Sequence, residues 1–281
     1  MIDALLGCLM AGLIVIKFGG GLITKKQSMC TPNIPVIEKL AKTVAELIQS
    51  RHNVIIVHGA GSFGHLKAKK WQLHLGRVTD NLPKEEGEIS SQDEAIHSVR
   101  QDMLTLNGIV CDILQSHGIE TSTHPPHIWA QEIGPQFEGD VARFASGNSV
   151  VNVTFGDVVK CSGPTEFGIL SGDDICYRIG DELGATHVVF AMGGASGLLT
   201  SPPDTPNSKL IPIWHPGYSF VGEHKSEMDV TGGIHLKLER SAELSKSVEH
   251  VWIVDGEQPE RILELLSTGI TTGTRILPES P

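Results

Sequence analysis

The chain has 281 residues, of which 40% are hydrophobic and 20% are charged. This composition can bury a hydrophobic core, and it excludes disorder along the whole length. Acidic residues outnumber basic ones by 33 to 22, and aromatic residues make up only 5%. A net charge of -11 argues against nucleic acid and anionic membranes as partners, and so few aromatic residues argue against base stacking.

The expected elements, taken in chain order, alternate between short apolar runs and amphipathic helical patterns. The patterns predict a strand at Leu13–Ile16, a helix at 35–50, a strand at Val54–Val57, a helix at 91–116 and a strand at Val150–Phe155. They continue with a hairpin through Val158 to Ile169, a helix at 173–183, a strand at Val188–Ala191, a helix at 232–247, a strand at Val251–Val254 and a helix at 258–267. Such alternation predicts a mainly parallel sheet with helices on both faces, a three-layer α/β/α sandwich.

Cysteine usage and the N-terminal residues bear on the cellular compartment. The five cysteines form no C-x-x-C pair, which favours a reducing cytosol over a disulfide framework or a zinc knuckle. Residues 1–16 are apolar, but no basic region precedes them, and Lys17 ends the run short of the ~20 residues of a membrane span. We therefore expect a cytoplasmic protein whose N-terminal extension leads into the first buried strand.

Three glycine-rich segments each follow a predicted strand. They are KFGGG at Lys17–Gly21, HGAGSFGH at His58–His65 and DVTGGIHLK at Asp229–Lys237, which opens a predicted helix. Loop amides and helix N-termini bind anions at the carboxyl ends of parallel strands, and glycine lets phosphate oxygens approach. No Walker loop, G-x-x-x-x-G-K-[ST], is present. Two lysines and a histidine in these loops nevertheless suit phosphoryl transfer, which depends on positioning and on charge neutralisation.

Several motifs together resemble the amino acid kinase superfamily. They are KFGGGLIT, VHGAGSFGH, FGD at 155–157, GILSGDDI at 168–175, DVTGGI with Lys237, and GT-I at 273–276. The resemblance runs from about Val15 to Ile276, and SFGH and SGDD point within the superfamily to the isopentenyl phosphate kinases. It implies the amino acid kinase fold in one domain over 1–281, with a substrate-binding lobe at about 13–168 and a nucleotide-binding lobe at about 169–281.

The resemblance also implies an activity. The expected reaction is ATP-dependent phosphorylation of isopentenyl phosphate to isopentenyl diphosphate, a step of isoprenoid biosynthesis in the mevalonate pathway, with Mg²⁺ bridging the nucleotide phosphates. The expected substrate is a small phosphate with an apolar tail, so we expect a hydrophobic pocket beside His65. A homodimer is a further expectation from the family.

Site residues follow from the resemblance, position by position. Lys17, His65, Asp173 and Lys237 would be catalytic: the lysines would stabilise the transferring phosphoryl group, His65 would donate a hydrogen bond to the substrate phosphate, and Asp173 would orient the lysines as a buried counter-charge. ATP would be bound by Lys17, Phe18, Gly19, Gly20, Gly21, Gly61, Gly194, Gly233 and Lys237, and the acceptor by Ala60, Gly61, His65 and Gly172. No residue is assigned as a metal ligand. A phosphate monoester is already anionic near neutral pH, because its second pKa is about 6, so no general base is expected.

The chain departs from the family at the turn after Val188–Ala191. It reads GGASG, so that Gly194 and Ser196 stand where the family carries the carboxylates of an Asp-x-Asp-Gly turn. Either Ser196 and backbone groups substitute for them, or the chain is a degraded kinase that serves as a nucleotide- or phosphate-binding protein. The retained charged residues favour the first interpretation. A kinase for another small phosphate or phosphonate, of the fosfomycin-kinase type, is a further alternative.

Other features have simpler structural interpretations. Because SGDD precedes a helical pattern, we expect Asp174 to cap that helix while Asp173 orients the lysines. His65 could merely cap the helix that follows it. We expect His124-Pro-Pro-His127 to be a loop and not a metal site, and Lys67–Lys70 to be a solvated helix face.

Overall fold

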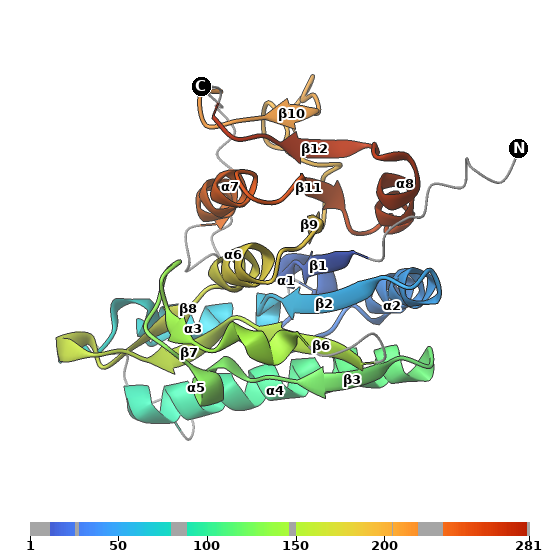
Figure 1. Ribbon diagram of the computed structural model, residues 1–281. Coiled ribbons are helices and arrows are strands. Elements are labelled where there is room, and N and C mark those ends of the chain that lie inside the picture. The colour runs from blue at the N-terminus through green and yellow to red at the C-terminus, as the bar shows by residue number, and fades with distance from the viewer. Residues whose placement is uncertain are drawn as a thin grey trace, which may run out of the picture.

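Helices cover both faces of an eight-stranded sheet in this protein (Figure 1). The computed structural model describes residues 12–25, 28–79, 89–145, 150–203, 205–218 and 233–279. The expected N-terminal extension before residue 12 lies outside the described residues, as do positions 229–232 of the third glycine-rich segment. The predicted α/β/α sandwich with a mainly parallel sheet is confirmed.

The central strand of the large sheet is β1 (Leu13–Phe18), which lies between β2 (Asn53–His58) and β9 (His187–Met192). The full strand order is β10-β12-β11-β9-β1-β2-β6-β3, and all neighbouring pairs are parallel except β11 with β12. The other strands are β3 (Glu120–Thr123), β6 (Val150–Phe155), β10 (Ile213–Trp214), β11 (His250–Asp255) and β12 (Gly273–Ile276). The loops that follow β1, β2, β6 and β9 therefore lie at the same edge of the sheet.

Alternating side chains of β1 divide the interior into two cores. Ile14, Ile16 and Phe18 pack in one core with α2, α4 and α8, whereas Val15 packs in the other with α6 and α7, and Figure 1 shows these helix groups on opposite faces. Because neighbouring side chains of a strand point to opposite faces, Lys17 lies on the α6 side at the carboxyl end of β1. The helices are α2 (Ile34–Gln49), α4 (Gln92–Ser116), α6 (Gly172–Glu182), α7 (Gly233–Leu244) and α8 (Glu260–Thr268).

A second, four-stranded sheet has the order β5-β4-β7-β8. Its strands β7 (Asp157–Lys160) and β8 (Phe167–Leu170) form the predicted antiparallel hairpin, and β4 (Ala130–Gln131) and β5 (Glu138–Gly139) complete it. Strand β8 ends one residue before Ser171, which leads into α6. The short helices are α1 (Gly20–Ile23), α3 (His65–Lys70) and α5 (Pro126–Trp129).

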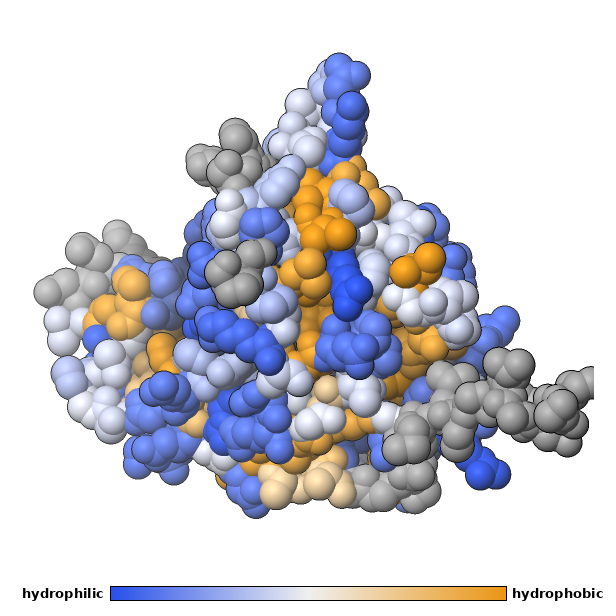
Figure 2. Space-filling view, turned by 45° about the horizontal axis from the view of Figure 1, so that its top comes forward, coloured by the Kyte–Doolittle hydropathy of each residue, from blue (hydrophilic) through white to orange (hydrophobic). Residues whose placement is uncertain are grey.

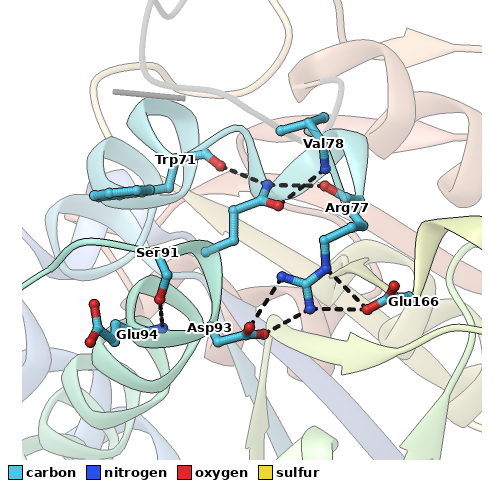
Figure 3. Close-up of polar contacts among 9 residues, drawn as sticks. Trp71, Arg77, Val78, Ser91, Asp93, Glu94 and Glu166 are labelled. Atoms are coloured by element: carbon cyan, nitrogen blue, oxygen red, sulfur yellow. Dashed lines mark hydrogen bonds and ion pairs between the residues drawn. The ribbon is translucent and has the colours of Figure 1, made fainter. Parts of the chain in front are cut away.

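Arg77 ties this hairpin to the start of α4 (Figure 3). Its two terminal guanidinium nitrogens donate to Asp93 at 2.8 and 3.2 Å, and its Nε donates to Glu166 at 3.0 Å. Glu166 lies in the hairpin turn with a φ of 57°, a left-handed conformation. Because both carboxylates are more than half exposed, each pair contributes at most about 1 kcal/mol, so the network fixes the hairpin's position more than it stabilises the fold.

Two local features differ from the sequence-based expectations. Pro126–Trp129 forms one helical turn instead of a loop, because His127 Nδ1 lies 2.6 Å from the buried carboxylate of Asp157 and anchors it. Lys67 does not belong to a solvated helix face, because its ammonium pairs with Asp102 and its side chain is only 15% exposed.

On the face shown in Figure 2, hydrophilic side chains are interspersed with a central strip of hydrophobic side chains and with several smaller hydrophobic patches. No helix in the described part of the chain combines the length and apolarity that crossing a membrane requires. The large hydrophobic side chains that are at least half exposed belong to separate segments, which is normal for a globular chain. They are Met29, Leu75, Ile128, Ile213 and Ile270.

Candidate active site

The backbones of the first two glycine-rich loops pack against each other at the carboxyl ends of β1 and β2. A Cβ on Gly20 would lie 2.3 Å from the Gly61 nitrogen, and one on Gly59 would lie 2.5 Å from the Gly20 nitrogen. Thr24 holds this contact, because its Oγ1 accepts a hydrogen bond from the Ser62 nitrogen at 3.0 Å and donates one to the Gly20 oxygen at 2.8 Å. Glycine is therefore required here for the close approach of two main chains.

The loop after β9 joins the other two loops. The Gly19 nitrogen donates to the Ala191 oxygen at 2.9 Å, and a Cβ on Gly193 would lie 3.2 Å from the Cα of Leu22. Gly194 follows with a φ of 79° and with open space around its Cβ position. The GGASG turn, where the chain departs from the family, thus lies directly beside the first glycine-rich loop.

Asp173 bridges the two lysines that the sequence analysis selected. Its Oδ2 lies 2.6 Å from Lys17 Nζ, and its Oδ1 accepts a hydrogen bond from Lys237 Nζ at 2.8 Å. The three residues come from β1, α6 and α7, and their side chains are 7 to 12% exposed. Lys237 also lies over the ring of Phe190, 4.8 Å from its centre. Two ammonium groups and one carboxylate leave a net positive charge at this edge, which suits an anionic ligand.

Burial and charge act against each other within this cluster. Burial by itself would raise the pKa of Asp173, but the charges of Lys17 and Lys237 outweigh it and hold this pKa below its ordinary value. Asp173 therefore stays ionised at neutral pH and serves as a counter-charge. Burial lowers the pKa of Lys237, and the nearby charge of Lys17 lowers it further. Burial also acts to lower the pKa of Lys17, but the charge of Asp173 outweighs it and raises this pKa. Cys176 lies beside the cluster, and burial raises the pKa of its thiol to about 12, so the thiol stays protonated.

Gly172 lies where the hairpin passes into α6, against the first lysine. A Cβ on Gly172 would lie 3.2 Å from Lys17 Cε and 3.4 Å from Val57 Cγ1. Gly156, at the end of β6, approaches the same turn, because a Cβ on it would lie 3.3 Å from the Gly172 nitrogen. The structure therefore brings Gly172 together with the lysine cluster and with the ends of β2 and β6.

The cap of α6 is Ser171, and the expectation that Asp174 caps this helix is wrong. Ser171 Oγ accepts a hydrogen bond from the Asp173 nitrogen at 3.1 Å, which is the capping contact. The carboxylate of Asp174 is buried and pairs instead with Arg240. Ser171 stands at the N-cap position, from which a side-chain oxygen reaches the amide two residues on, whereas the Asp174 carboxylate is engaged by Arg240.

Ala60 and His65 lie at the two ends of the second loop. Ala60 precedes a short 3-10 helix at Gly61–Phe63, and His65 begins α3 with a half-buried side chain. Gly64 lies between them, and a Cβ on it would lie 3.4 Å from the sulfur of Met103, a buried residue of α4. The side of the loop that faces α4 is therefore apolar.

The remaining residues expected at a nucleotide site have different surroundings. Phe18 is fully buried, and its oxygen accepts a hydrogen bond from the Gly59 nitrogen at 2.9 Å, so its side chain does not face a ligand. Gly21 is exposed in α1, beside Gly193. Gly233 begins α7 one turn before Lys237 and has a φ of 58°, a conformation that favours glycine.

Three residues that organise the site were missed from the sequence. They are Thr24, Ser171 and Arg240. Ser171 had a usable signal, because S-x-x-D at Ser171–Asp174 matches the helix-capping pattern. Thr24 and Arg240 had none, because the contacts that join them to other elements, with Ser62 and Asp174, span 38 and 66 positions of the sequence.

Glycine loops lie at a parallel-sheet edge beside two buried lysines that share one carboxylate, an arrangement that suits phosphoryl transfer. Comparison with known proteins gives the family. The sequence profile of the amino acid kinase family matches residues 12–255, and the chain belongs to this family.

Several similar proteins are isopentenyl phosphate kinases. The isopentenyl phosphate kinase of Thermoplasma acidophilum is 29% identical over 253 residues, which cover 89% of this chain and 94% of the relative. That of Methanothermobacter thermautotrophicus is 26% identical over 275 residues, with 94% and 98% covered. An isopentenyl phosphate kinase substrate complex superposes with a TM-score of 0.74 at 25% identity, covering 94% of this chain and 99% of that chain.

Proposed function

We propose that this phosphotransferase moves the γ-phosphoryl group of ATP to isopentenyl phosphate and forms isopentenyl diphosphate. The observation that carries the proposal is the pair of buried lysines on Asp173, at the sheet edge where the loops after β1, β2 and β9 lie. Relatives named isopentenyl phosphate kinase align with nearly the whole chain, and the fold matches a substrate complex of such an enzyme.

The nucleophile needs little activation in this reaction. A phosphate monoester has a second pKa of about 6, so an acceptor oxygen is anionic at neutral pH. That oxygen attacks the γ-phosphorus, the bond to the β-phosphate oxygen breaks, and ADP leaves. The low pKa of Asp173 fits this scheme, because a carboxylate held ionised by two lysines is a poor general base. Catalysis then depends on positioning and on charge stabilisation by Lys17 and Lys237.

Acceptor and nucleotide approach this cluster from different loops in the proposal. His65, Ala60, Gly61 and Gly172 hold the acceptor phosphate, with the His65 imidazole donating a hydrogen bond to it. The first glycine loop, Gly194, Gly233 and the two lysines hold ATP. The second loop packs through Gly64 against the fully buried Met103, and the apolar tail of the acceptor is proposed from the likeness to isopentenyl phosphate kinases.

Magnesium fits this site as a companion of ATP. The buried carboxylate of the cluster is engaged by two lysines, and the turn at 193–197 carries no carboxylate. The ion would therefore be held mainly by phosphate oxygens and water, as Mg²⁺ commonly is. When bound, it neutralises charge on the β- and γ-phosphates.

The wider setting is also a proposal. We assign the acceptor to a lobe at about 13–168 and the nucleotide to a lobe at about 169–281, and we expect a cytoplasmic homodimer. The four described cysteines, Cys30, Cys111, Cys161 and Cys176, are all free thiols, which supports a reducing compartment.

A panel of acceptors with radiolabelled ATP tests the substrate. We expect labelled product from isopentenyl phosphate, and none when ATP is omitted. Turnover of a polar phosphonate of the fosfomycin type without turnover of isopentenyl phosphate would contradict the proposed acceptor.

A calorimetric titration with a non-hydrolysable ATP analogue tests the rival interpretation of the GGASG turn. We expect measurable binding, because both lysines and the glycine loops are retained. Absence of binding would favour a protein that has lost kinase activity.

A further inference from the structure

A second buried ion pair lies one helical turn from the catalytic lysine of α7. The guanidinium Nε of Arg240 pairs with Asp174 Oδ1, and the two side chains are 10% and 5% exposed. The same guanidinium donates through Nη1 to Glu239 Oε1 at 2.7 Å. Neither Asp174 nor Arg240 touches the glycine loops through any hydrogen bond in the described residues, so the pair lies behind the site.

The two ion pairs run in parallel between the same two helices. Asp173 and Asp174 are neighbours in the first turn of α6, and Lys237 and Arg240 are three residues apart on one face of α7. The bonds Asp173–Lys237 and Asp174–Arg240 therefore join the start of α6 to α7 at two points. Helix α7 also packs in the core through Ile234, Leu238 and Ala242, and the two ion pairs fix its register against α6 more narrowly than one would.

The Lys237 ammonium needs this constraint. Its only ion-pair partner in the described residues is Asp173, which it shares with Lys17. A nucleotide phosphate competes for the same ammonium, so the bond that holds α7 through Lys237 weakens when a ligand binds. The Arg240 bond does not involve the ligand and persists.

The outer edge of Arg240 borders an open cavity of about 540 Å³. Tyr177, Arg178 and Glu239 also line it. Side-chain packing from that direction is therefore incomplete, and the position of the guanidinium depends on its charged partners. Burial disfavours the ionised form of Asp174, so this pair is costly to form unless its geometry is good.

We propose that Arg240 and Asp174 are positioning residues, which fix α7 against α6 so that Lys237 stays aligned with the phosphoryl group while it exchanges Asp173 for nucleotide phosphate. The inference rests on the proposed role of Lys237 in binding ATP. A displacement of about 1 Å at a reacting group can reduce turnover about 100-fold, so loss of this pair has a measurable effect on the reaction.

Arg240→Met tests the proposal, with Arg178→Met as the matched control. Arg178 borders the same cavity with a side chain that is 16% exposed, and it donates to the Gly139 oxygen at 3.2 Å and pairs with Glu182, away from the lysines. We expect Arg240→Met to lower kcat about 10- to 100-fold per folded molecule, with the acceptor KM changed less than about 3-fold. Arg178→Met should leave kcat within about 2-fold. Equal effects of the two variants would overturn the proposal.

Conservative and paired variants separate positioning from stability. Arg240→Lys keeps the charge and should recover kcat to within about 5-fold of the original chain. If Arg240→Met does not fold, Asp174→Leu combined with Arg240→Met removes both buried charges and leaves none unpaired. We expect this double variant to fold with kcat still reduced about 10-fold or more, and an unchanged kcat would refute the positioning role.

A binding measurement keeps this test independent of the acceptor. With a non-hydrolysable ATP analogue, Arg240→Met should raise the Kd about 5-fold or more, whereas Arg178→Met should not. If the unaltered chain binds the analogue but phosphorylates no isopentenyl phosphate, the proposed acceptor is wrong, and these Kd values still decide the role of Arg240. A chain that binds no analogue would overturn both proposals.

Discussion

At the scale of single residues, the Asp173 carboxylate is the shared counter-charge of two buried lysines. It compensates the cost of burying Lys17 and Lys237, and it leaves each ammonium one strong partner that a phosphate can replace. In the proposed reaction, the γ-phosphoryl group of ATP meets the net positive charge of this cluster. An acidic protein can therefore bind anions, because the local charge at the site and not the total charge of the chain decides the interaction.

Lys17→Ala removes one of the two positive charges of this cluster. Loss of one electrostatic donor commonly lowers kcat about 100- to 1,000-fold, and we expect a fall in this range with a smaller rise in the KM for ATP. Steady-state kinetics measure both constants. Lys246→Ala, which alters an exposed lysine paired with Glu243, is the control and should leave them unchanged. A larger effect on KM than on kcat would show that Lys17 binds the ground state.

His65→Ala tests the acceptor side of the site. The half-buried imidazole begins α3, and its removal should lower turnover of a phosphate acceptor about 100-fold while the fold is retained. His65→Gln keeps a hydrogen-bond donor without a positive charge, so partial activity there would assign the effect to hydrogen bonding. His74→Ala alters an exposed histidine and should have no effect. An unchanged rate in His65→Ala would contradict the acceptor assignment.

At the scale of elements, the carboxyl ends of β1, β2 and β9 bring three loops into direct backbone contact. The contact between Gly20 and Gly61 is too close for any side chain at either position. Thr24 adds two hydrogen bonds across it. The loops therefore pack as one unit, so a side chain added to one of them would displace its neighbour.

Gly20→Ala tests the packing of these loops, and Gly108→Ala is a control for which we expect the opposite effect on stability. The new Cβ at Gly20 would lie 2.3 Å from a backbone nitrogen, so we expect a loss of about 1 to 3 kcal/mol in unfolding free energy and a clear loss of activity. Gly108 lies inside α4 with open space at its Cβ position, so alanine there should stabilise the protein by about 0.5 to 1 kcal/mol. Urea denaturation measures both. Equal effects would show that backbone crowding does not limit the loops.

The elements differ in how far their sequences predicted them. The 25-residue helix α4 repeats its apolar positions over many turns, and the Ser91 cap and Gly118 mark its ends, so the expected range of 91–116 nearly matches the observed Gln92–Ser116. Strand β3 reads ETST and lies at the edge of the sheet, with no fully buried residue and no apolar alternation, so it was missed. Local patterns reveal an element only where burial makes them regular.

At the scale of the whole molecule, four histidines in or beside the strands of the large sheet have lowered pKa values. His58 and His187 have pKa values of about 4, first because burial disfavours the charged ring, and burial also lowers those of His52 and His250. His187 and His250 stack with ring centres 4.4 Å apart at the amino edge of the sheet, away from the glycine loops. Protonation of either ring therefore places a charge beside the other.

These histidines predict a loss of stability in weak acid. Their pKa values are lower in the folded protein than the value of about 6.5 in the unfolded chain, so the unfolded chain binds more protons as the pH falls. Their contribution is intact above about pH 6.5 and is lost as the pH falls towards about 4. Unfolding free energies from urea titrations between pH 7.5 and 4.5 measure the slope.

Two histidine variants test whether buried histidines cause the change of unfolding free energy with pH. His187→Gln should flatten the slope, because the substituted side chain does not titrate, whereas His74→Gln, at an exposed position, should not. Equal unfolding free energies at about pH 7 and about pH 5 would contradict the prediction.

By itself the sequence determined the sandwich, most of its strands and helices, and the residue types that serve phosphoryl transfer. These features depend on periodicity within short segments and on glycines and lysines that follow strands, so neighbouring residues suffice to reveal them. The resemblance to the family already implied that Asp173 orients Lys17 and Lys237, but only the tertiary structure decided that Gly20 lies against Gly61 and that Asp174 pairs with Arg240 in place of a helix cap. Such contacts join residues far apart in the chain, and only the folding of the whole sheet with its helices brings their charges within bonding distance.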